Sequence, residues 1–167
     1  DHEIVVYEKE PRLGGHSHTV DVDHGGTTIP VDTGFIVYNE LNYPNLTALF
    51  AELGVETIPT NMTFGFSSLN GSLEWQGNTI GSLFAQKSNL FSLSFHRMWL
   101  DILRFRRNGL ADLNAGRTQG HSLGTYLKKN GYSDAFRDHC IVPMGAAIWS
   151  TSASEMLSFP AESFIRF

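Results

Sequence analysis

The chain has 167 residues, a hydrophobic fraction of 41% and a net charge of −5, which allows one domain, or a domain and a half, around a buried core. The acidic balance excludes the basic surface that nucleic-acid binding needs, so we expect no nucleic-acid partner. Cys140 is the single cysteine. It excludes an intrachain disulfide and agrees with a cytoplasmic location, and we expect it to be a small buried residue.

The first predicted element is a strand over residues 3–8. Residues 4–7 form an unbroken apolar run, which is typical of a strand buried on both faces of a parallel sheet. The strand ends at the acid Glu8, and a glycine-rich loop follows. The chain begins inside this predicted strand and ends on an apolar segment. We therefore expect a fragment that is truncated at both ends.

A β-hairpin is predicted next. Residues 18–23 and 27–32 flank a turn that contains Gly25 and Gly26, and a Gly-Gly pair between two such segments favours a tight hairpin turn. Pro30 has no N–H to donate, so we expect it on an edge or near a strand end.

The clearest predicted helix covers residues 42–55. Its apolar residues recur at the spacing of one helical face, and they are Leu46, Leu49, Phe50 and Leu53. Pro44 suits the first turn and Gly54 suits the C-terminal cap.

Short strands and turns are predicted over residues 55–80, and helices over most of the remaining chain. One helix places a set of apolar residues at helical spacing, namely Phe95, Met98, Trp99, Ile102 and Leu103. The nearby Arg104, Arg106 and Arg107 are interpreted as a solvated face, with contact to a membrane surface as the alternative.

Further helices are predicted over residues 122–130 and 134–149, and we expect Pro143 to kink or break the second of them. Ser152 and Glu155 form a capping-box pattern that opens a last helix. The composition changes near residue 60. The pattern predicts an α/β class, α+β within the fragment, with residues 1–60 as a partial Rossmann-like FAD/NAD(P)-binding domain. Residues 61–167 would form part of a mostly helical substrate-binding domain.

The segment after the first strand has the residue types that a dinucleotide site needs. A carboxylate at the end of a parallel strand, such as Glu8, can accept hydrogen bonds from the two hydroxyls of an adenosine ribose. Gly14 and Gly15 allow close approach of the backbone to a pyrophosphate, and Arg12 can add a charge-assisted contact. The G-x-G-x-x-G fingerprint of such sites is absent, because no two of the sixteen glycines lie two positions apart.

The stretch EIVVYEKEPRLGGHSHT resembles the N-terminal segment of the flavin-dependent amine oxidase superfamily, which includes phytoene-desaturase-type enzymes and protoporphyrinogen oxidases. Arg12, Gly14, Gly15, His16 and Thr19 fill the family pattern R-x-G-G-[R/H]-x-x-[T/S]. The continuation IPVDTGFIVYNELNYPNLTALFAELGV is similar to the next block of the superfamily, an acid-x-Gly turn and then a helix that ends in E-L-G. The later stretch VPMGAAIWSTSASEMLSFPAESFIRF is similar to a bacterial subgroup described as predicted NAD/FAD-binding proteins.

The resemblance implies FAD as the cofactor and an oxidoreductase that oxidises a C–N or C–C bond by hydride transfer to the flavin. It implies that Glu8 holds the ribose. The residues that it places beside the pyrophosphate are Arg12, Gly14, Gly15 and His16. It also places Gly34, Phe35 and Ile36 close to the isoalloxazine ring. His16 stands where many members have arginine, so a hydrogen bond is the contact expected of it. No catalytic residue is implied.

Other interpretations of the same residues remain open. His16, His18 and His24 suggest a metal site, but no carboxylate or thiolate set completes a shell, so we expect no metal. A nucleotide-binding or scaffold module without redox activity is the alternative function. The substrate is expected to be a small molecule, and the Phe-rich second half is compatible with an apolar one. The oligomeric state is left open.

Overall fold

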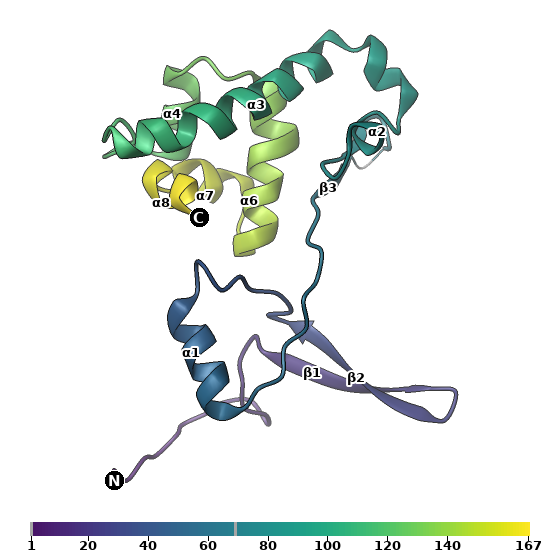
Figure 1. Cartoon of the computed structure of the whole chain (residues 1–167), viewed down its shortest axis with the longest axis vertical. Helices are drawn as coiled ribbons and strands as arrows, with labels where there is room; N and C mark the ends of the chain where they lie inside the picture. The colour runs from purple at the N-terminus through teal and green to yellow at the C-terminus, as the bar shows by residue number, and fades with distance from the viewer. Residues whose placement is uncertain (1, 69) are drawn as a thin grey trace. The chain divides into compact units, whose positions relative to one another are not determined.

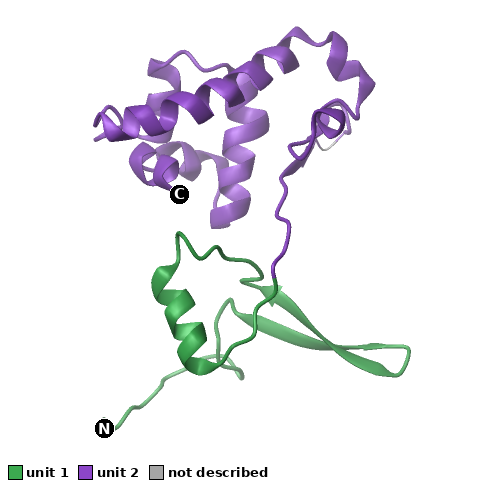
Figure 2. Ribbon diagram, in the orientation of Figure 1, with its two compact units in different colours: residues 1–58 green, residues 59–167 purple. Residues whose placement is uncertain are grey.

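The computed structural model describes residues 2–68 and 70–167. The chain divides into two compact units, residues 1–58 and residues 59–167, called unit 1 and unit 2 (Figure 2). The change of composition near residue 60 lies close to this division. The assignment of the two parts to cofactor and substrate remains a prediction.

Unit 1 contains an antiparallel ribbon of β1 (His18–His24) and β2 (Thr27–Gly34), which confirms the predicted hairpin (Figure 1). Gly25 and Gly26 have φ of +63° and +85°, the sign that a two-residue type I′ turn requires at both central positions. Pro30 pairs with Asp21 in the middle of β2. Its missing N–H is tolerated because both strands of a two-stranded ribbon are edges.

The predicted helix of unit 1 is α1 (Pro44–Leu53). Pro44 lies in its first turn, and Gly54 caps its end in the left-handed conformation at φ 66°, as expected for a helix that begins with proline and ends before glycine. Leu46 and Phe50 are half-buried. None of the described residues of unit 1 is fully buried, so the ribbon and the helix do not enclose a core of their own.

The prediction of a strand over residues 3–8 is wrong for this structure. The segment has no regular structure, and the side chains of Ile4 to Tyr7 are between 67% and 93% exposed. A strand of a parallel sheet is held by hydrogen bonds to its neighbours. The described sheets are the β1–β2 ribbon and a second two-stranded ribbon, and neither includes this segment.

Unit 2 begins with that second ribbon, β3 (Gly65–Ser67) and β4 (Glu74–Gln76), within the range predicted for short strands. The helical elements follow in the order α2 (Ile80–Leu83), the 3₁₀-helix η1 (Lys87–Phe91), α3 (Leu93–Asn114), α4 (Leu123–Lys129), α5 (Asp134–Phe136), the π-helix η2 (Arg137–Ile141), α6 (Val142–Trp149), α7 (Ala153–Ser158) and α8 (Ala161–Arg166). Over the described ranges, no helix has the length and apolar character needed to cross a membrane.

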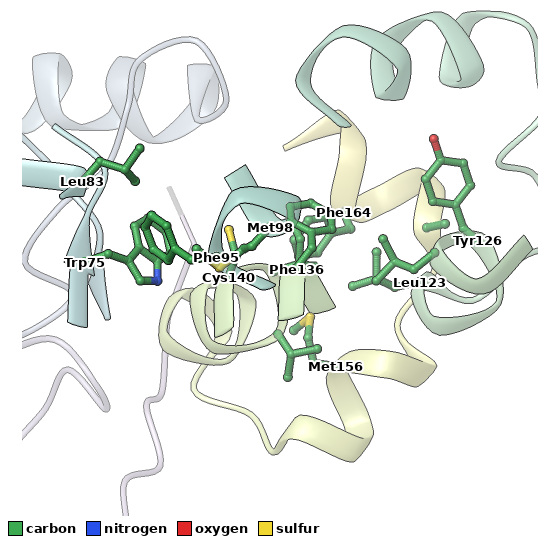
Figure 3. Close-up of a cluster of buried hydrophobic side chains, with 14 residues drawn as sticks. Trp75, Leu83, Phe95, Met98, Leu123, Tyr126, Phe136, Cys140, Met156 and Phe164 are labelled. Carbon is green, nitrogen blue, oxygen red and sulfur yellow. The ribbon is translucent and has the colours of Figure 1, made fainter. Parts of the chain in front are cut away.

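The core of unit 2 gathers side chains from both ends of this helical region. Its buried members are shown in Figure 3, and they include Met98, Leu123, Phe136, Met156 and Phe164. α3 packs against α5 and α8, and α4 packs against α7 and α8. Gly145 lets α6 approach this core, because a Cβ there would lie 2.6 Å from the sulfur of Met156.

Local capping signals were predicted correctly in this unit. Ser122 caps α4, and Gly131 follows its end at φ +63°. Ser152 and Glu155 form the predicted capping box at α7. The hydroxyl of Ser152 donates to the carboxylate of Glu155 at 2.6 Å, and hydrogen bonds from Ser152 lower the pKa of Glu155 below its ordinary value.

The helical segment from residue 134 to residue 149 is not one regular α-helix. A new helix, α6, begins at Val142 with Pro143 in its first turn, which agrees with the predicted kink or break at Pro143. The chain passes through the π-helical turn η2 immediately before it. In a regular helix the N–H of residue 143 would bond to the carbonyl of His139, and proline has no such N–H. The indole N–H of Trp75 donates to that carbonyl instead, at 3.1 Å. Trp75 thus ties the β3–β4 ribbon to the helical part of unit 2.

Replacing Trp75 with phenylalanine is expected to lower the free energy of unfolding by about 1–3 kcal/mol, because the carbonyl of His139 loses its donor. The change in stability is measured by urea unfolding. Pro143→Ala restores an N–H near this carbonyl, so Trp75→Phe should cost less when both changes are combined. Strictly additive effects of the two substitutions would contradict this role of the indole.

The interpretation of Arg104 as part of a solvated face is also wrong. Its guanidinium lies 4.0 Å from the ring centroid of Tyr132, and its Nη2 lies 3.1 Å from Asp101 Oδ1. Asp101 is buried, and its Oδ2 accepts a hydrogen bond from the backbone N–H of Ser133 at 2.8 Å. The Asp101 carboxylate therefore joins α3 to the start of α5. Arg106 and Arg107 are exposed.

Candidate cofactor site

The loop that follows Glu8 is closed by the side chain of Arg12. Its Nη1 donates to the carbonyl of Ser17 at 3.1 Å, and its Nη2 donates to the carbonyl of Gly15 at 2.8 Å. The N–H of Ser17 donates to the carbonyl of Gly14 at 3.0 Å. Arg12 thus holds the shape of the loop, and its remaining N–H groups are those left to meet a ligand.

The two glycines of the loop have different roles. A Cβ at Gly14 would lie 2.7 Å from the carbonyl oxygen of Ser17, so this glycine allows the loop to approach itself. Gly15 has a φ of +58°, and a Cβ there would meet no atom within 4 Å. Gly15 therefore presents an open backbone surface of the kind that a phosphate group can approach.

Gly34 brings the end of β2 against this loop. A Cβ at Gly34 would overlap the carbonyl oxygen of His16, so the close approach requires glycine. Phe35 follows with a φ of +54°, an unusual value for a residue with a side chain. Phe35 and Ile36 are 50% and 64% exposed. The structure therefore brings together two predicted groups, residues 12–16 and 34–36, that are far apart in the sequence.

Glu8 is not joined to this arrangement by any hydrogen bond among the described residues. Its Oε1 accepts hydrogen bonds from the backbone N–H groups of Lys9 and Glu10, at 2.7 and 2.9 Å. These bonds fix the carboxylate and leave Oε2 as the oxygen open to a ligand. If both carboxylate oxygens contacted a ribose, Oε1 would have to accept a hydrogen bond from a ribose hydroxyl in addition to those from the two backbone amides.

Sequence reasoning missed the partner of Thr19. The Thr19 hydroxyl donates to Asp32 Oδ1 at 2.6 Å, and the two residues pair across the ribbon. The hydroxyl of Thr33 donates to the carbonyl of His18 at 2.9 Å. The Gly25-Gly26 turn places residue 19 opposite residue 32, so the register of the hairpin could have revealed the first pair.

The histidines of this region show no metal-binding arrangement. His18 Nδ1 lies 3.3 Å from the hydroxyl oxygen of Thr33, and His16 is exposed. In the part of the chain that the structure describes, no three His, Cys, Asp or Glu side chains form a group that could hold a metal ion. Burial raises the pKa of the Cys140 thiol to about 12, so Cys140 is a protonated core residue near neutral pH.

Unit 2 contains hollows that the predicted site residues do not line. One, of about 590 Å³, is lined by residues that include Phe66, Glu74 and Trp75. Another, of about 250 Å³, is lined by residues that include Asn89 and His139. Both hollows lie within unit 2.

The loop of residues 12–17 and the segment of residues 34–36 lie together within unit 1. The comparison with known families is more specific. Residues 1–154 match the family described as flavin containing amine oxidoreductase, and the chain belongs to this family. No match was found among curated proteins or among solved structures.

Family membership supports FAD as the cofactor. The residues present agree with this cofactor at two points, the open backbone surface at Gly15 and the uncommitted Oε2 of Glu8. The charge of unit 1 adds a constraint. Residues 1–58 carry ten Asp and Glu against two Lys and Arg, a net charge of −8. A pyrophosphate group is anionic, so Arg12 and the backbone N–H groups of the loop are the groups that can attract it.

Proposed function

We propose that this chain supplies the ribose and pyrophosphate side of the FAD site in an oxidoreductase that oxidises a C–N or C–C bond. The supporting observation is the approach of Gly34 to the carbonyl of His16. This contact gathers the loop of residues 12–17 and the segment of residues 34–36 into one surface. Bound FAD would accept the hydride, and protein groups would hold and orient it.

Each predicted residue has a distinct task in this proposal. Glu8 accepts a hydrogen bond from a ribose hydroxyl through Oε2. Gly15 lets the backbone approach the pyrophosphate, and Arg12 keeps the loop in shape while adding positive charge. Thr19 keeps β1 and β2 in register through Asp32. Phe35 and Ile36 offer exposed apolar surface to the ring system, as suits a flat, largely apolar group.

Replacing Glu8 with glutamine is expected to raise the dissociation constant for FAD about tenfold or more, because a charge-assisted hydrogen bond to the ribose is lost. The measurement is a titration of FAD with the chain, followed by quenching of flavin fluorescence. Glu10→Gln is the matched control. It removes the same charge two residues away, and affinity should stay within about twofold of the unchanged chain.

Equal weakening by the two substitutions would show that only the net charge matters and would contradict the role of Glu8. Absence of any quenching by the unchanged chain would contradict the proposed cofactor role of this chain. The position of Glu8 in an exposed segment means that neither substitution should alter the fold, which far-ultraviolet circular dichroism checks.

A second candidate function is a nucleotide-binding or scaffold module without redox activity. One observation favours it: unit 1 has no fully buried residue among those described, so it lacks the rigid support that catalytic sites need. The two functions are separated by comparing FAD with ADP. Binding of ADP as tight as that of FAD would indicate that the flavin ring makes no contact and would favour the module.

The substrate is proposed to be a small molecule that contacts unit 2. The hollow lined by Phe66 and Trp75 supports an apolar component, while Glu74 and Gln76 add polar groups to the same hollow. A panel of apolar and polar amines, tested for reduction of the flavin in the loaded protein, decides between the two kinds of substrate. A cytoplasmic location is proposed from the single, buried cysteine.

A further inference from the structure

The smaller hollow of unit 2 has a polar lining that the proposed FAD site does not use. Its volume is about 250 Å³, and its walls come from the segment before β4, from η1, from the first turns of α3 and from α5 and η2. None of its lining residues is Asp, Glu, Lys or Arg. We call this space, bounded by Ser88, Asn89, Ser94, Phe95 and His139, the Asn89 hollow.

Asn89 is a buried polar residue with one unused oxygen. It is 3% exposed, and its Nδ2 donates to the carbonyl of Glu74 at 2.8 Å. No described residue donates to its Oδ1. The polar side-chain atoms that are sealed from solvent without a hydrogen bond, among the described residues, belong to Arg104 and Thr118. The Oδ1 of Asn89 is therefore open to the hollow that this residue lines, and a buried acceptor of this kind calls for a donor.

The first turn of α3 brings unused donors to the same hollow. The hydroxyl of Ser92 accepts the N–H of Phe95 at 3.2 Å, whereas the N–H of Ser94 has no acceptor in the described part of the chain. N–H groups at the start of a helix carry its partial positive charge. The hydroxyls of Ser88 and Ser94 also make no hydrogen bond to a described residue, so each can donate or accept.

His139 adds an imidazole ring whose position is fixed from two sides. Its carbonyl accepts the indole N–H of Trp75 at 3.1 Å, and its ring centroid lies 5.5 Å from that of Phe66. Neither ring nitrogen bonds to a described residue. His139 belongs to the π-helical turn η2, a helical irregularity that is frequent at functional sites. The Asn89 hollow thus gathers unused polar groups from η1, α3 and η2.

These groups select a neutral ligand. A cation would meet the positive end of α3. A carboxylate would place an oxygen against Asn89 Oδ1, and the lining has no Lys or Arg to compensate for its charge. A carboxamide carries an oxygen that can accept from Ser94 and an NH₂ group that can donate to Asn89.

The rest of the lining limits the size and polarity of the ligand. Phe95 and Met98 supply apolar surface beside the polar groups, and the volume of about 250 Å³ is below the usual range of drug-sized pockets. We propose that the Asn89 hollow binds a small neutral molecule that carries a carboxamide. This site goes beyond the proposed function, because its occupation does not require FAD.

The first test titrates the flavin-free chain with benzamide, benzoate and benzylamine, which share one ring and differ in charge, and follows amide NMR shifts. Benzamide should shift the signals of Asn89, Ser94 and His139 saturably, with a dissociation constant of about 1 mM or lower. Benzoate and benzylamine should bind at least about fivefold more weakly, because each leaves one unused group without its complement.

Three outcomes of this titration would overturn the proposal. The first is the absence of a saturable shift with benzamide. The second is equal affinity for the three probes, which would show contact with the ring alone. The third is binding of benzyl alcohol as tight as that of benzamide, which would assign the hollow to a hydroxyl group instead of a carboxamide.

The second test locates the site with substitutions. Ser94→Ala removes a lining hydroxyl, and His139→Phe keeps a ring beside Phe66 while removing both ring nitrogens. Each should raise the dissociation constant for benzamide about threefold or more. Ser163→Ala is the matched control, because Ser163 is an exposed helical serine in α8 that does not line the hollow. Unchanged affinity in both Ser94→Ala and His139→Phe would contradict the site, and neither test depends on the FAD titrations.

Discussion

Gly34→Ala is expected to separate the end of β2 from the glycine-rich loop and to weaken FAD binding at least about tenfold. The added Cβ would overlap the carbonyl oxygen of His16, so the backbone of one segment must move. Gly34 does not have a positive φ, so alanine adds no strain to its own backbone. The effect therefore tests the contact between the two segments.

Two measurements follow this change. Fluorescence titration gives the affinity for FAD, and amide chemical shifts of residues 14–18 report the position of the loop without any cofactor. The control is Gly25→Asn at the tip of the ribbon. Gly25 has open space around it and a φ of +63°, a conformation that asparagine tolerates. Unchanged loop shifts and unchanged affinity in Gly34→Ala would contradict the proposed arrangement of the site.

Asp101→Ala is expected to lower the free energy of unfolding by about 3 kcal/mol, because it removes a buried carboxylate from two arginines and one backbone donor. The Asp101 side chain is 3% exposed, whereas the side chains of Arg104 and Arg97 are 31% and 57% exposed. Solvent therefore screens part of the positive charge that is left unpaired. For this reason the expected loss in free energy of unfolding is at the lower end of the range for breaking a buried ion pair.

Urea unfolding gives this loss directly. Asp134→Ala is the matched control, since Asp134 pairs with Arg137 at 2.7 Å but its side chain is 83% exposed. Its removal should cost less than about 1 kcal/mol. Asp101→Asn, which can still accept a hydrogen bond from the N–H of Ser133, should fall between the two alanine variants. Similar losses for the two alanine variants would show that burial of Asp101 has no special effect.

The sequence predicted the elements whose signals are local. The Gly25-Gly26 turn sets the ribbon, Pro44 and Gly54 bound α1, and Ser152 with Glu155 opens α7. Each of these signals acts within a few residues through backbone dihedral preference or a single capping bond. The match to the flavin containing amine oxidoreductase family likewise confirms the resemblance drawn from the sequence.

The candidate site was predicted residue by residue from the resemblance, and the roles toward FAD remain predictions. The structure adds what the residues do for the chain itself. Gly14 and Gly34 allow close approach of the backbone to Ser17 and His16, and Arg12 closes the loop. A sequence pattern does not distinguish a glycine that admits a ligand from one that admits another part of the same chain, because both need the absence of a side chain.

The sequence alone determined the family, the charge, and the helices and turns with local boundary signals. Only the tertiary structure decided the state of residues 3–8, the burial of Asp101 beside Arg104, and the hydrogen-bond donor to the carbonyl of His139. The physical reason is the same in the three cases. A strand needs partner strands, and a buried carboxylate needs surrounding side chains that exclude water. The carbonyl of His139 needs the hydrogen bond that the indole of Trp75 donates. These partners come from distant parts of the chain.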